Sequence, residues 1–551
     1  MAIDRLQDED LVKALLRNQD RMESERAPWE GVWQEIDERV NPLGAGGFAK
    51  ASPAGQVRGA RNFDVTAVEG LDRFSAAMAA ITIPRNTQYI RLKFGDKDLD
   101  RLPSVRRWCE RAADRLYAIR YAPQRNFHVQ GQEDFRQLGT YGTGPLWTGL
   151  RPGFGPFYKT LHLSECYIDE DFTGRIDTVH RKYELTARQC AQEFGEDALT
   201  GKMRDCYRDD RKRNDKFQIL HVVRPNADVQ PDALDRRSMP VDSITIAIDD
   251  KTILRRKGFR SMPISVSRHL TGPCDKYGMS PAFKVLPTIK GLNAMRRTIL
   301  RVAHKAADPA LAFYDDEVTG LVTRPGGANP GLVDQNGRLL VARMPGGEGN
   351  LPVNMEMIEQ ERAVVRTAFL EDFFKILTDP SDRMTATQVL EMMDKQGVLV
   401  SPFAGRYESE KQNPVTQRDL ELAMAAGQVD PFPPEVIEAG AYPLIEYENP
   451  LSRMARAQEA TGLTRWVEAM TPLAQVDGGA VFDHIDTDAA APGLADVLGV
   501  RPSWIATAEQ VAEKRRARAD SQAAAAGVEQ LEGVADAYQS IAKGNQIAEA
   551  A

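Results

Sequence analysis

The stretch SPAFKVLPTIKGLNAMRRTILRVAHK, residues 280–305, has apolar side chains at the three- and four-residue spacing of a long helix. At about 100° per residue these side chains fall on one face. The other face carries four basic residues within a stripe of about 80°: Lys290, Arg297, Arg301 and Lys305. Pro287 lies in the first turns, where a missing donor is tolerated or produces a bend. We therefore predict an amphipathic helix with a basic back.

A second helix is predicted over residues 354–377, NMEMIEQERAVVRTAFLEDFFKIL. Its apolar residues share a face: Ile358, Val365, Phe369 and Phe373. Residues 307–353, between the two helices, are rich in Gly and Pro and contain turn pairs such as Asn336-Gly337, which predicts a small, partly β unit. The order helix, inserted unit, helix is the pattern on which the rest of the prediction depends.

The segments before residue 280 predict an α+β body. The first forty residues have helical spacing, interrupted at Pro28 and ended by Asn41-Pro42. A helix is expected to begin at Phe63-Asp-Val-Thr66. Strands are expected at 157–168, 176–183, 217–223, 244–248 and 259–266, with one short helix opened by the capping box Thr186 to Gln189.

The segments after residue 377 are predicted to be mainly helical. Asp379 to Arg383 is a polar break, and a longer helical region is expected from Met384 to Gly427, broken near Pro402 and Pro414. A tail rich in Ala, Gln and Glu follows from Glu509. The whole chain is therefore predicted to be α+β and mainly α.

Composition excludes several classes of protein. The chain has 551 residues, of which 42% are hydrophobic and 27% charged, so it is neither largely disordered nor collagen-like. Its 71 basic and 79 acidic residues give a net charge of −8, which argues against a protein that wraps nucleic acid tightly. No apolar run is long enough for a membrane span, and the opening MAIDRLQDED lacks the apolar core of a secretion signal, so we expect no membrane partner.

Motifs for catalysis and metal binding are incomplete. Five cysteines without a CxxC pair support neither a zinc ribbon nor a disulfide framework and are expected to be reduced and buried. Gly331 to Arg338 has the wrong spacing for a phosphate-binding loop, and the glycines of Gly139 to Gly144 predict a helix end or a close packing contact. No catalytic, cofactor or metal site is therefore predicted, and we expect the protein not to be an enzyme.

Two acidic clusters resemble metal sites in part. Asp169 to Gly174 has alternating carboxylates but no glutamate at the twelfth position of a calcium loop. We therefore predict a hairpin turn here in preference to a calcium site. Asp483, His484, Asp486 and Asp488 contain suitable ligands for a nuclease metal, but no second cluster supports them. A capped, solvated helix end is preferred for this second cluster.

In order along the chain, a set of short motifs resembles the portal proteins, or head-to-tail connectors, of short-tailed double-stranded DNA bacteriophages. Each motif is weak alone, and the ordered set is specific. One position departs from the family pattern, because Gln388 stands where an acidic residue is expected. The motifs are Trp29 to Pro42, Phe63 to Thr66, Asn126-Phe127, Gly139 to Gly144, Tyr167 to Gly174, Tyr277 to Pro281 with Asn293, Met384 to Val389, Asn449 to Leu451 and Leu498 to Pro502.

The resemblance implies a ring of about twelve subunits around a DNA channel at one capsid vertex. It also implies a division of the chain: a wing (1–279), a first stem helix (280–306), a clip (307–353), a second stem helix (354–377), a channel loop (378–385), wing return helices (386–448) and a helical crown with a C-terminal tail (449–551). The helix, inserted unit, helix pattern agrees independently with a stem pair that carries a clip.

The resemblance implies that one loop of each subunit projects into the channel. This channel loop consists of Thr378, Asp379, Pro380, Ser381, Asp382, Arg383, Met384 and Thr385. Pro380 stops one helix, and Ser381 or Thr385 can cap the next, so a loop with fixed ends is expected to narrow the channel. Arg383 would touch phosphates there. The alternative is an ordinary interhelical turn at a subunit interface.

Two sets of basic residues are candidates for contact with DNA, with a neighbouring subunit or with partner proteins. Lys290, Arg297, Arg301 and Lys305 face either the channel or the outside of the stem, and we favour the outside or a subunit seam because rings of cations would hold DNA too strongly to let it slide. The clip is expected to present Arg324, Arg338 and Arg343 to partner proteins.

The resemblance implies partners and a place of action. The partners are further copies of the chain, double-stranded DNA, the terminase large subunit, tail adaptor or nozzle proteins, and the major capsid, scaffold and internal core proteins. The protein is expected at the capsid portal vertex of the virion, and in the host cytoplasm during assembly. The alternatives are another ring-forming tail or tube protein and, more remotely, a DNA-processing hydrolase that depends on Asp483 or Asp486.

Overall fold

The structure is a computed structural model in which two compact units are distinguished: residues 1–90 with 114–430, and residues 91–113 with 431–551. The parts of the chain it describes are residues 2–42, 44, 48, 59, 62–85, 87–151, 155–233, 235–308, 310–313, 322, 328, 329, 332, 333, 336–343, 351–371, 403–447, 466, 469–472, 490, 506 and 510–522. The two units are described separately.

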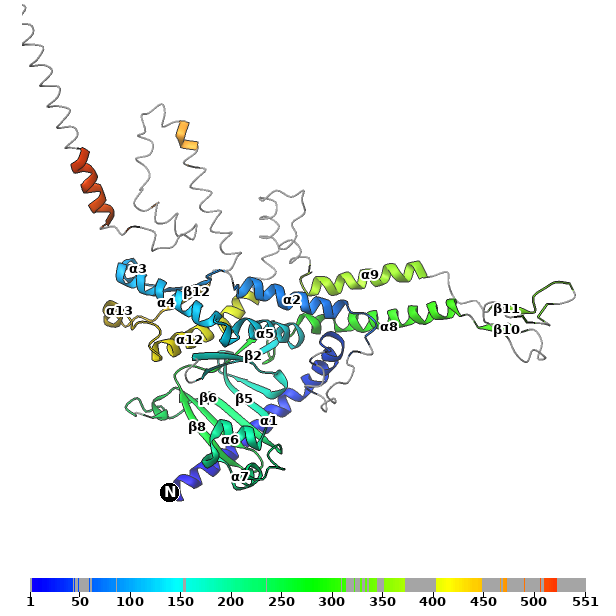
Figure 1. The fold of residues 1–551 in the computed structure, drawn as a ribbon, viewed down its shortest axis with the longest axis horizontal. Coiled ribbons are helices and arrows are strands. Elements are labelled where there is room, and N and C mark those ends of the chain that lie inside the picture. Colours follow the sequence, from blue (N-terminus) through cyan, green and yellow to red (C-terminus); the bar gives the residue numbers. More distant parts are fainter. Residues whose placement is uncertain are drawn as a thin grey trace, which may run out of the picture. The chain divides into compact units, whose positions relative to one another are not determined.

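The first unit opens with helix α1 (Ala2–Val40), which is continuous through Pro28 (Figure 1). The predicted interruption at Pro28 is therefore wrong. Buried side chains on both sides of the proline, such as Met22 and Trp33, anchor each half of the helix against the body and outweigh the lost hydrogen bond. The predicted end at Asn41-Pro42 is confirmed.

A five-stranded antiparallel sheet forms the centre of the predicted wing. Its strands, in spatial order, are β4 (Cys166–Glu170), β5 (Ile176–Thr186), β6 (Lys216–Pro225), β7 (Val241–Ala247) and β8 (Thr252–Phe259). Because side chains alternate along a strand, Leu220 and Ile244 pack against α1, whereas Ile219 packs against the two short helices α6 (Ala187–Phe194) and α7 (Gly201–Arg208). The sheet is thus covered by helices on both faces, and the capping box at Thr186 is confirmed.

A second antiparallel sheet has three strands, in the order β3 (Gly155–Thr160), β2 (Thr143–Arg151) and β9 (Ile264–Arg268). Two predicted strands, 157–168 and 259–266, are each split, because the chain leaves one sheet and enters the other at residues 161–165 and 260–263. Strand β2 was not predicted. It follows α5 (Phe127–Tyr141), which ends at Gly142 with φ +79, as the glycine run indicated.

The predicted helix, inserted unit, helix order is confirmed within the described residues (Figure 1). Helix α8 (Pro281–Ala307) is followed by the antiparallel pair β10 (Leu311–Phe313) and β11 (Val341–Arg343) and then by α9 (Leu351–Ala368). The second helix was predicted to reach residue 377, but α9 ends at Ala368 because Leu370 adopts a left-handed conformation with φ +59. Residues 372–402 lie outside the described part.

The chain is helical again from residue 403 to the end of α12 (Asn413–Ala425). The predicted break near Pro414 is wrong, because residues Glu408–Gln412 form a π-helical turn immediately before it. A π turn shifts the hydrogen-bond register by one residue, which avoids the clash of a proline ring with the carbonyl four residues earlier. Helix α2 (Thr66–Thr82) packs on α5 and completes the helical layer of this unit.

The second unit contains α3 (Lys97–Arg101), residues 103–113 of α4 (Pro103–Tyr121), α13 (Pro434–Ala439) and a two-stranded sheet of β1 (Ile90–Lys93) and β12 (Leu444–Tyr447). Phe94, Trp108 and Phe432 pack their rings together in its core. Most of the predicted crown, residues 449–551, falls outside the described residues. Within the described residues, every helix is too short or too polar to cross a membrane.

Candidate functional site

The α8–α9 pair is the first candidate surface. The Ser280 hydroxyl caps α8 by accepting a hydrogen bond from the Phe283 amide at 2.9 Å. Ile289, Leu292 and Asn293 are buried, whereas from residue 294 to 305 no side chain of α8 is buried. The first half of the helix therefore anchors in the body, and the second half projects from it together with α9 (Figure 1).

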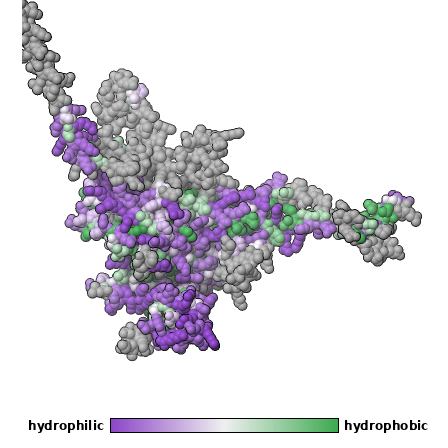
Figure 2. Space-filling model, viewed as in Figure 1, coloured by the Kyte–Doolittle hydropathy of each residue, from purple (hydrophilic) through white to green (hydrophobic). Residues whose placement is uncertain are grey.

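Charge is distributed unequally over this pair. Helix α8 contains six Lys and Arg residues and no Asp or Glu, whereas α9 contains three Glu and two Arg. Several large apolar side chains are also exposed on the pair, and Figure 2 shows apolar residues gathered along it. They are Leu300, Met355, Met357 and Val364. Exposed apolar side chains grouped on a projecting element are typical of a surface that is covered in an assembly.

The predicted basic stripe is divided in two by the structure. Lys290 Nζ lies 2.7 Å from Glu35 of α1, and this hydrogen bond lowers the pKa of the Glu35 carboxyl. The Arg297 guanidinium lies 5.8 Å from the centre of the Phe63 ring. Arg301 and Lys305 are exposed and form no ion pair with any described residue. Two members of the stripe therefore stabilise the subunit, and two remain available to a partner.

Residues from separate predicted motifs meet at the base of the pair. Asn293 Oδ1 accepts hydrogen bonds from the Phe63 and Asp64 amides at 2.8 and 3.1 Å. Asp64 accepts one from the Thr66 amide at 3.0 Å and pairs with Arg362 of α9 at 2.7 Å. Burial raises the pKa of Asp64, but the bonds from Thr66 and Arg362 outweigh burial and lower it. The start of α2 is thereby tied to both α8 and α9.

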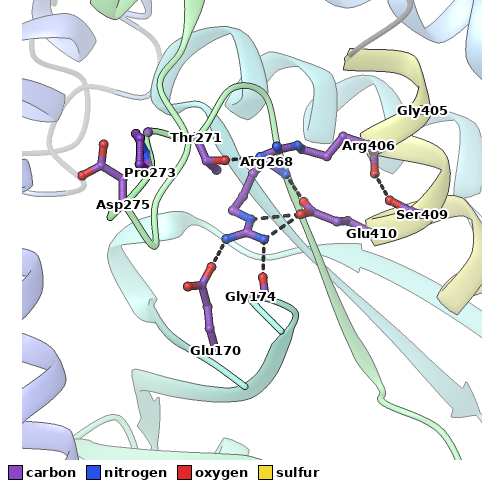
Figure 3. Close-up of a pocket in the computed structure, with 11 residues that line it drawn as sticks. Glu170, Gly174, Arg268, Thr271, Pro273, Asp275, Gly405, Arg406, Ser409 and Glu410 are labelled. Atoms are coloured by element: carbon purple, nitrogen blue, oxygen red, sulfur yellow. Dashed lines mark hydrogen bonds and ion pairs between the residues drawn. The ribbon is translucent and has the colours of Figure 1, made fainter. Parts of the chain in front are cut away.

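A polar pocket of about 550 Å³ lies where three distant segments meet (Figure 3). At its centre, the Arg268 side chain donates to Glu410 at 2.7 Å, to the Gly174 carbonyl at 2.9 Å and to the Lys276 carbonyl at 3.2 Å, and it also pairs with Glu170. Burial lowers the pKa of Arg268, and the two carboxylates outweigh burial and raise it. Arg268 is therefore a clamp that joins the β4–β5 hairpin, β9 and the π turn.

Two buried ion pairs hold the segment 403–425 in the body. Lys411 Nζ donates to Asp134 Oδ1 at 3.0 Å and to the carbonyls of Gly144 and Ser265 at 2.7 and 2.9 Å. Arg120 pairs with Asp419 at 2.7 Å, and the Tyr158 hydroxyl donates to the same carboxylate at 2.7 Å. All four charged side chains are buried. These pairs therefore join residues 411–419 to α4, α5 and the three-stranded sheet.

The model of the bacteriophage head to tail connecting protein family matches this chain over residues 12–505. The chain belongs to that family. The sequence is 26% identical to a probable portal protein of Bordetella phage BPP-1 over 525 residues, and 25% identical to the portal protein of Salmonella phage epsilon15 over 536 residues. Each match covers 93% of this chain and 92% of the relative. The predicted family resemblance is thereby confirmed.

Among solved structures, this connecting protein is similar to a chain in the neck of an empty GTA particle with C6 symmetry. The sequence identity is 15% and the TM-score 0.30, and the match covers 69% of this chain and 91% of that one.

Several predicted site residues of the connecting protein lie outside the described residues. These are the whole channel loop 378–385, Arg324 of the insert, and the cluster Asp483 to Asp488. Arg338 is exposed, and Arg343 lies on β11. Arg268, Lys411 and the other buried charges were not predicted from the sequence, because the groups that pair with them lie far away along the chain.

Among the described residues, no three His, Cys, Asp or Glu side chains are grouped so that they could hold a metal ion. Cys109, Cys166 and Cys190 are buried, and burial raises the pKa of each thiol. Cys206 is half-buried and Cys274 is exposed, so the prediction of buried thiols is wrong for Cys274.

Proposed function

We propose that the protein is the portal subunit of a double-stranded DNA bacteriophage, which forms a ring at one capsid vertex through which DNA is packaged and ejected. The observation that carries this proposal is the α8–insert–α9 unit, which projects from an α+β body in a chain of the head-to-tail connecting family. One relative compared above is named a probable portal protein and the other a portal protein. Each match covers almost the full length of both chains.

In this proposal the α+β body up to residue 279 is the wing, and α8 and α9 are the stem. The β10–β11 insert is the clip, which would meet the terminase motor during packaging and a tail adaptor or nozzle protein afterwards. Arg338 is exposed on this insert and is a candidate contact for those partners. Residues 386–448 return to the wing, and residues 449–551 form the crown.

The stem would also form the seam between subunits. A closed ring of identical subunits needs two different, complementary faces on each copy. The outer face of α8 offers Arg301 and Lys305, whereas Glu356 and the half-exposed Glu361 of α9 form no ion pair with described residues. Cations on one helix and carboxylates on the other favour contact between α8 of one copy and α9 of the next. About twelve copies are expected, and thirteen are possible in isolated rings because no capsid constrains closure.

The channel loop, residues 378–385, would grip or gate the DNA. Each subunit carries a net charge of −8, which keeps the channel wall weakly adhesive, because each phosphate neutralised by a cation adds affinity that would slow sliding. Arg383 would touch phosphates, with Asp379 and Asp382 limiting the affinity. The other partners are the capsid, scaffold and internal core proteins, and assembly would take place in the host cytoplasm.

The function is tested by packaging DNA into procapsids that contain the subunit, the subunit with Arg383→Ala, Asp379→Asn and Asp382→Asn, or no subunit. We expect the intact subunit to support filling and the loop variant to assemble rings but to lose or leak DNA. Normal retention by the loop variant would exclude a gate or grip at this loop. Filling of procapsids that lack the protein would instead favour a tail or tube component, which assembles after packaging.

A further inference from the structure

A helix near the end of the second unit, residues 510–522, buries none of its side chains (drawn in red in Figure 1). Its sequence is QVAEKRRARADSQ. Val511 is half-buried, and every other side chain of the helix is exposed. Helices of this length are marginal in water unless packing stabilises them. Almost the whole surface of this helix is therefore available to a partner.

Basic residues are concentrated in this helix. The last sixty residues of the chain, 492–551, contain six Lys and Arg, and four of these six stand within residues 514–518, KRRAR. The same sixty residues contain eight Asp and Glu, so a positive charge is not a general property of this end of the chain. Short runs of Lys and Arg are typical of surfaces that bind nucleic acids and other polyanions.

The charges of the helix are separated between two faces. At about 100° per residue, three cations fall within an arc of about 100°, which we call the cationic face. They are Lys514, Arg515 and Arg518. The two carboxylates of the helix, Glu513 and Asp520, lie at least about 100° away from each of these cations. The cationic face therefore contains no acidic side chain.

The fourth cation, Arg516, lies on the opposite face. It follows Glu513 by three residues and precedes Asp520 by four, the spacings at which helical side chains are neighbours. One cation and two carboxylates give that face a net charge of −1. On the cationic face, by contrast, Lys514 and Arg518 are four residues apart and repel each other, and neither forms an ion pair with a described residue. An anion from outside the chain would relieve this repulsion.

The composition of the helix favours DNA over a lipid surface as the source of that anion. A helix that lies on a membrane needs large apolar side chains, and Val511 is the only apolar side chain of this helix larger than Ala. A DNA duplex carries one negative charge per about 1.7 Å of its axis. Lys514 and Arg518 are about 6 Å apart along the helix axis, a length over which a duplex offers three or four phosphates. Guanidinium groups such as that of Arg518 also bind phosphate oxygens in pairs.

We propose that the cationic face of helix 510–522 binds the phosphates of double-stranded DNA without sequence preference. The inference rests on the proposed function, which brings DNA to the protein, and it adds a contact separate from the channel loop. Three cations give an affinity that falls about 40-fold between 50 and 200 mM salt. Each contact is therefore weak and reversible, and the copies in a ring would act together on one duplex.

The test measures binding of a fluorescein-labelled duplex of about 30 base pairs to the purified full-length protein, by fluorescence anisotropy at about 50 and 200 mM salt. The variant Lys514→Gln, Arg515→Gln and Arg518→Gln removes the cationic face. Gln resembles Lys and Arg in helix propensity, so the helix is retained. We expect the Kd of the variant to be at least roughly tenfold higher at the lower salt concentration, and its salt dependence to be weaker.

Two matched controls use the same assay. Arg175→Gln with Lys202→Gln and Arg236→Gln also removes one Lys and two Arg, all of them exposed and without an ion pair to described residues, from the first unit. This control should leave the Kd for the duplex unchanged. Arg516→Gln removes a cation from the opposite face of the same helix and should raise the Kd much less than Arg518→Gln does.

Three outcomes would overturn the inference. Equal effects of Arg516→Gln and Arg518→Gln would show a run of cations without a binding face. An unchanged Kd for the variant without the cationic face, in a protein that forms rings and fills procapsids, would exclude this DNA contact and leave the proposed function intact. If that variant keeps the duplex but no longer binds polyglutamate, the partner is an acidic protein and the inference is wrong.

Discussion

Replacement of Lys411 by Met should destabilise the first unit strongly. Lys411 is 2% exposed and its ammonium group satisfies three acceptors: Asp134 Oδ1, the Gly144 carbonyl and the Ser265 carbonyl. The Met side chain has similar length and fills the same space but offers no donor. The variant therefore leaves one buried carboxylate and two buried carbonyls without this partner.

The expected decrease in the free energy of unfolding follows from the loss of these three contacts. Removal of one member of a buried ion pair typically costs about 3–5 kcal/mol, because the remaining charge stays desolvated. Burial already raises the pKa of Asp134, so the carboxylate can take up a proton and reduce the cost. We therefore expect the free energy of unfolding to fall by about 3 kcal/mol at pH 8 and by less at pH 5, where protonation of Asp134 is easier.

The assay is urea unfolding of the subunit at concentrations below ring assembly, followed by tryptophan fluorescence. The double variant Lys411→Met with Asp134→Asn removes both charges. Its free energy of unfolding should therefore fall by less than the sum of the decreases in the two single variants. Lys202→Met is the matched control, since Lys202 is exposed and forms no ion pair with described residues, and it should change stability by less than about 0.5 kcal/mol. A loss below about 1 kcal/mol for Lys411→Met would refute the reasoning.

Three further outcomes are expected. Burial lowers the pKa of His180 and His269 to about 4 and that of His221 to about 3, so the unfolded chain takes up protons below about pH 6.5 while the folded chain does not. The urea midpoint should therefore fall between pH 6.5 and 4, and a midpoint that stays constant from pH 7 to 5 would contradict this. Gly278→Ala should cost about 2–3 kcal/mol, because its Cβ would lie 2.0 Å from the Gly142 carbonyl oxygen, and unchanged thermal unfolding would show that the two backbones can separate. Arg301→Glu with Lys305→Glu should weaken ring assembly in sedimentation experiments without lowering subunit stability, whereas normal rings that retain DNA poorly would place these side chains in the channel.

The long elements could be predicted because their periodicity is strong. Helix α8 begins within one residue of the predicted start, since Ser280 supplies a cap and the apolar stripe continues for several turns. The turn at Asn336-Gly337, which the bridge between Val333 and Leu339 encloses, and the turn at Asp171 were likewise indicated by local turn chemistry. These features depend on residues close together in the sequence.

The features that were missed depend on distant residues. From its neighbours in the sequence, Lys411 is predicted to be a surface lysine. In the structure, Asp134 and two strand carbonyls surround its ammonium group. Strand β2, TGPLWTGLR, contains two glycines and a proline, and it forms because β3 and β9 pair on its two sides. Pro28 and Pro414 both read as helix breaks, and each is tolerated through the surrounding packing or a π turn. Local propensity alone cannot show such compensation.

Direct imaging of the purified protein, combined with the mass of the particle in solution, tests whether the chain closes into a portal ring. We predict closed rings with an axial hole and a mass of about twelve times that of the subunit, 61.2 kDa. A stable 61.2 kDa monomer at high concentration, or compact particles without a hole, would contradict the account.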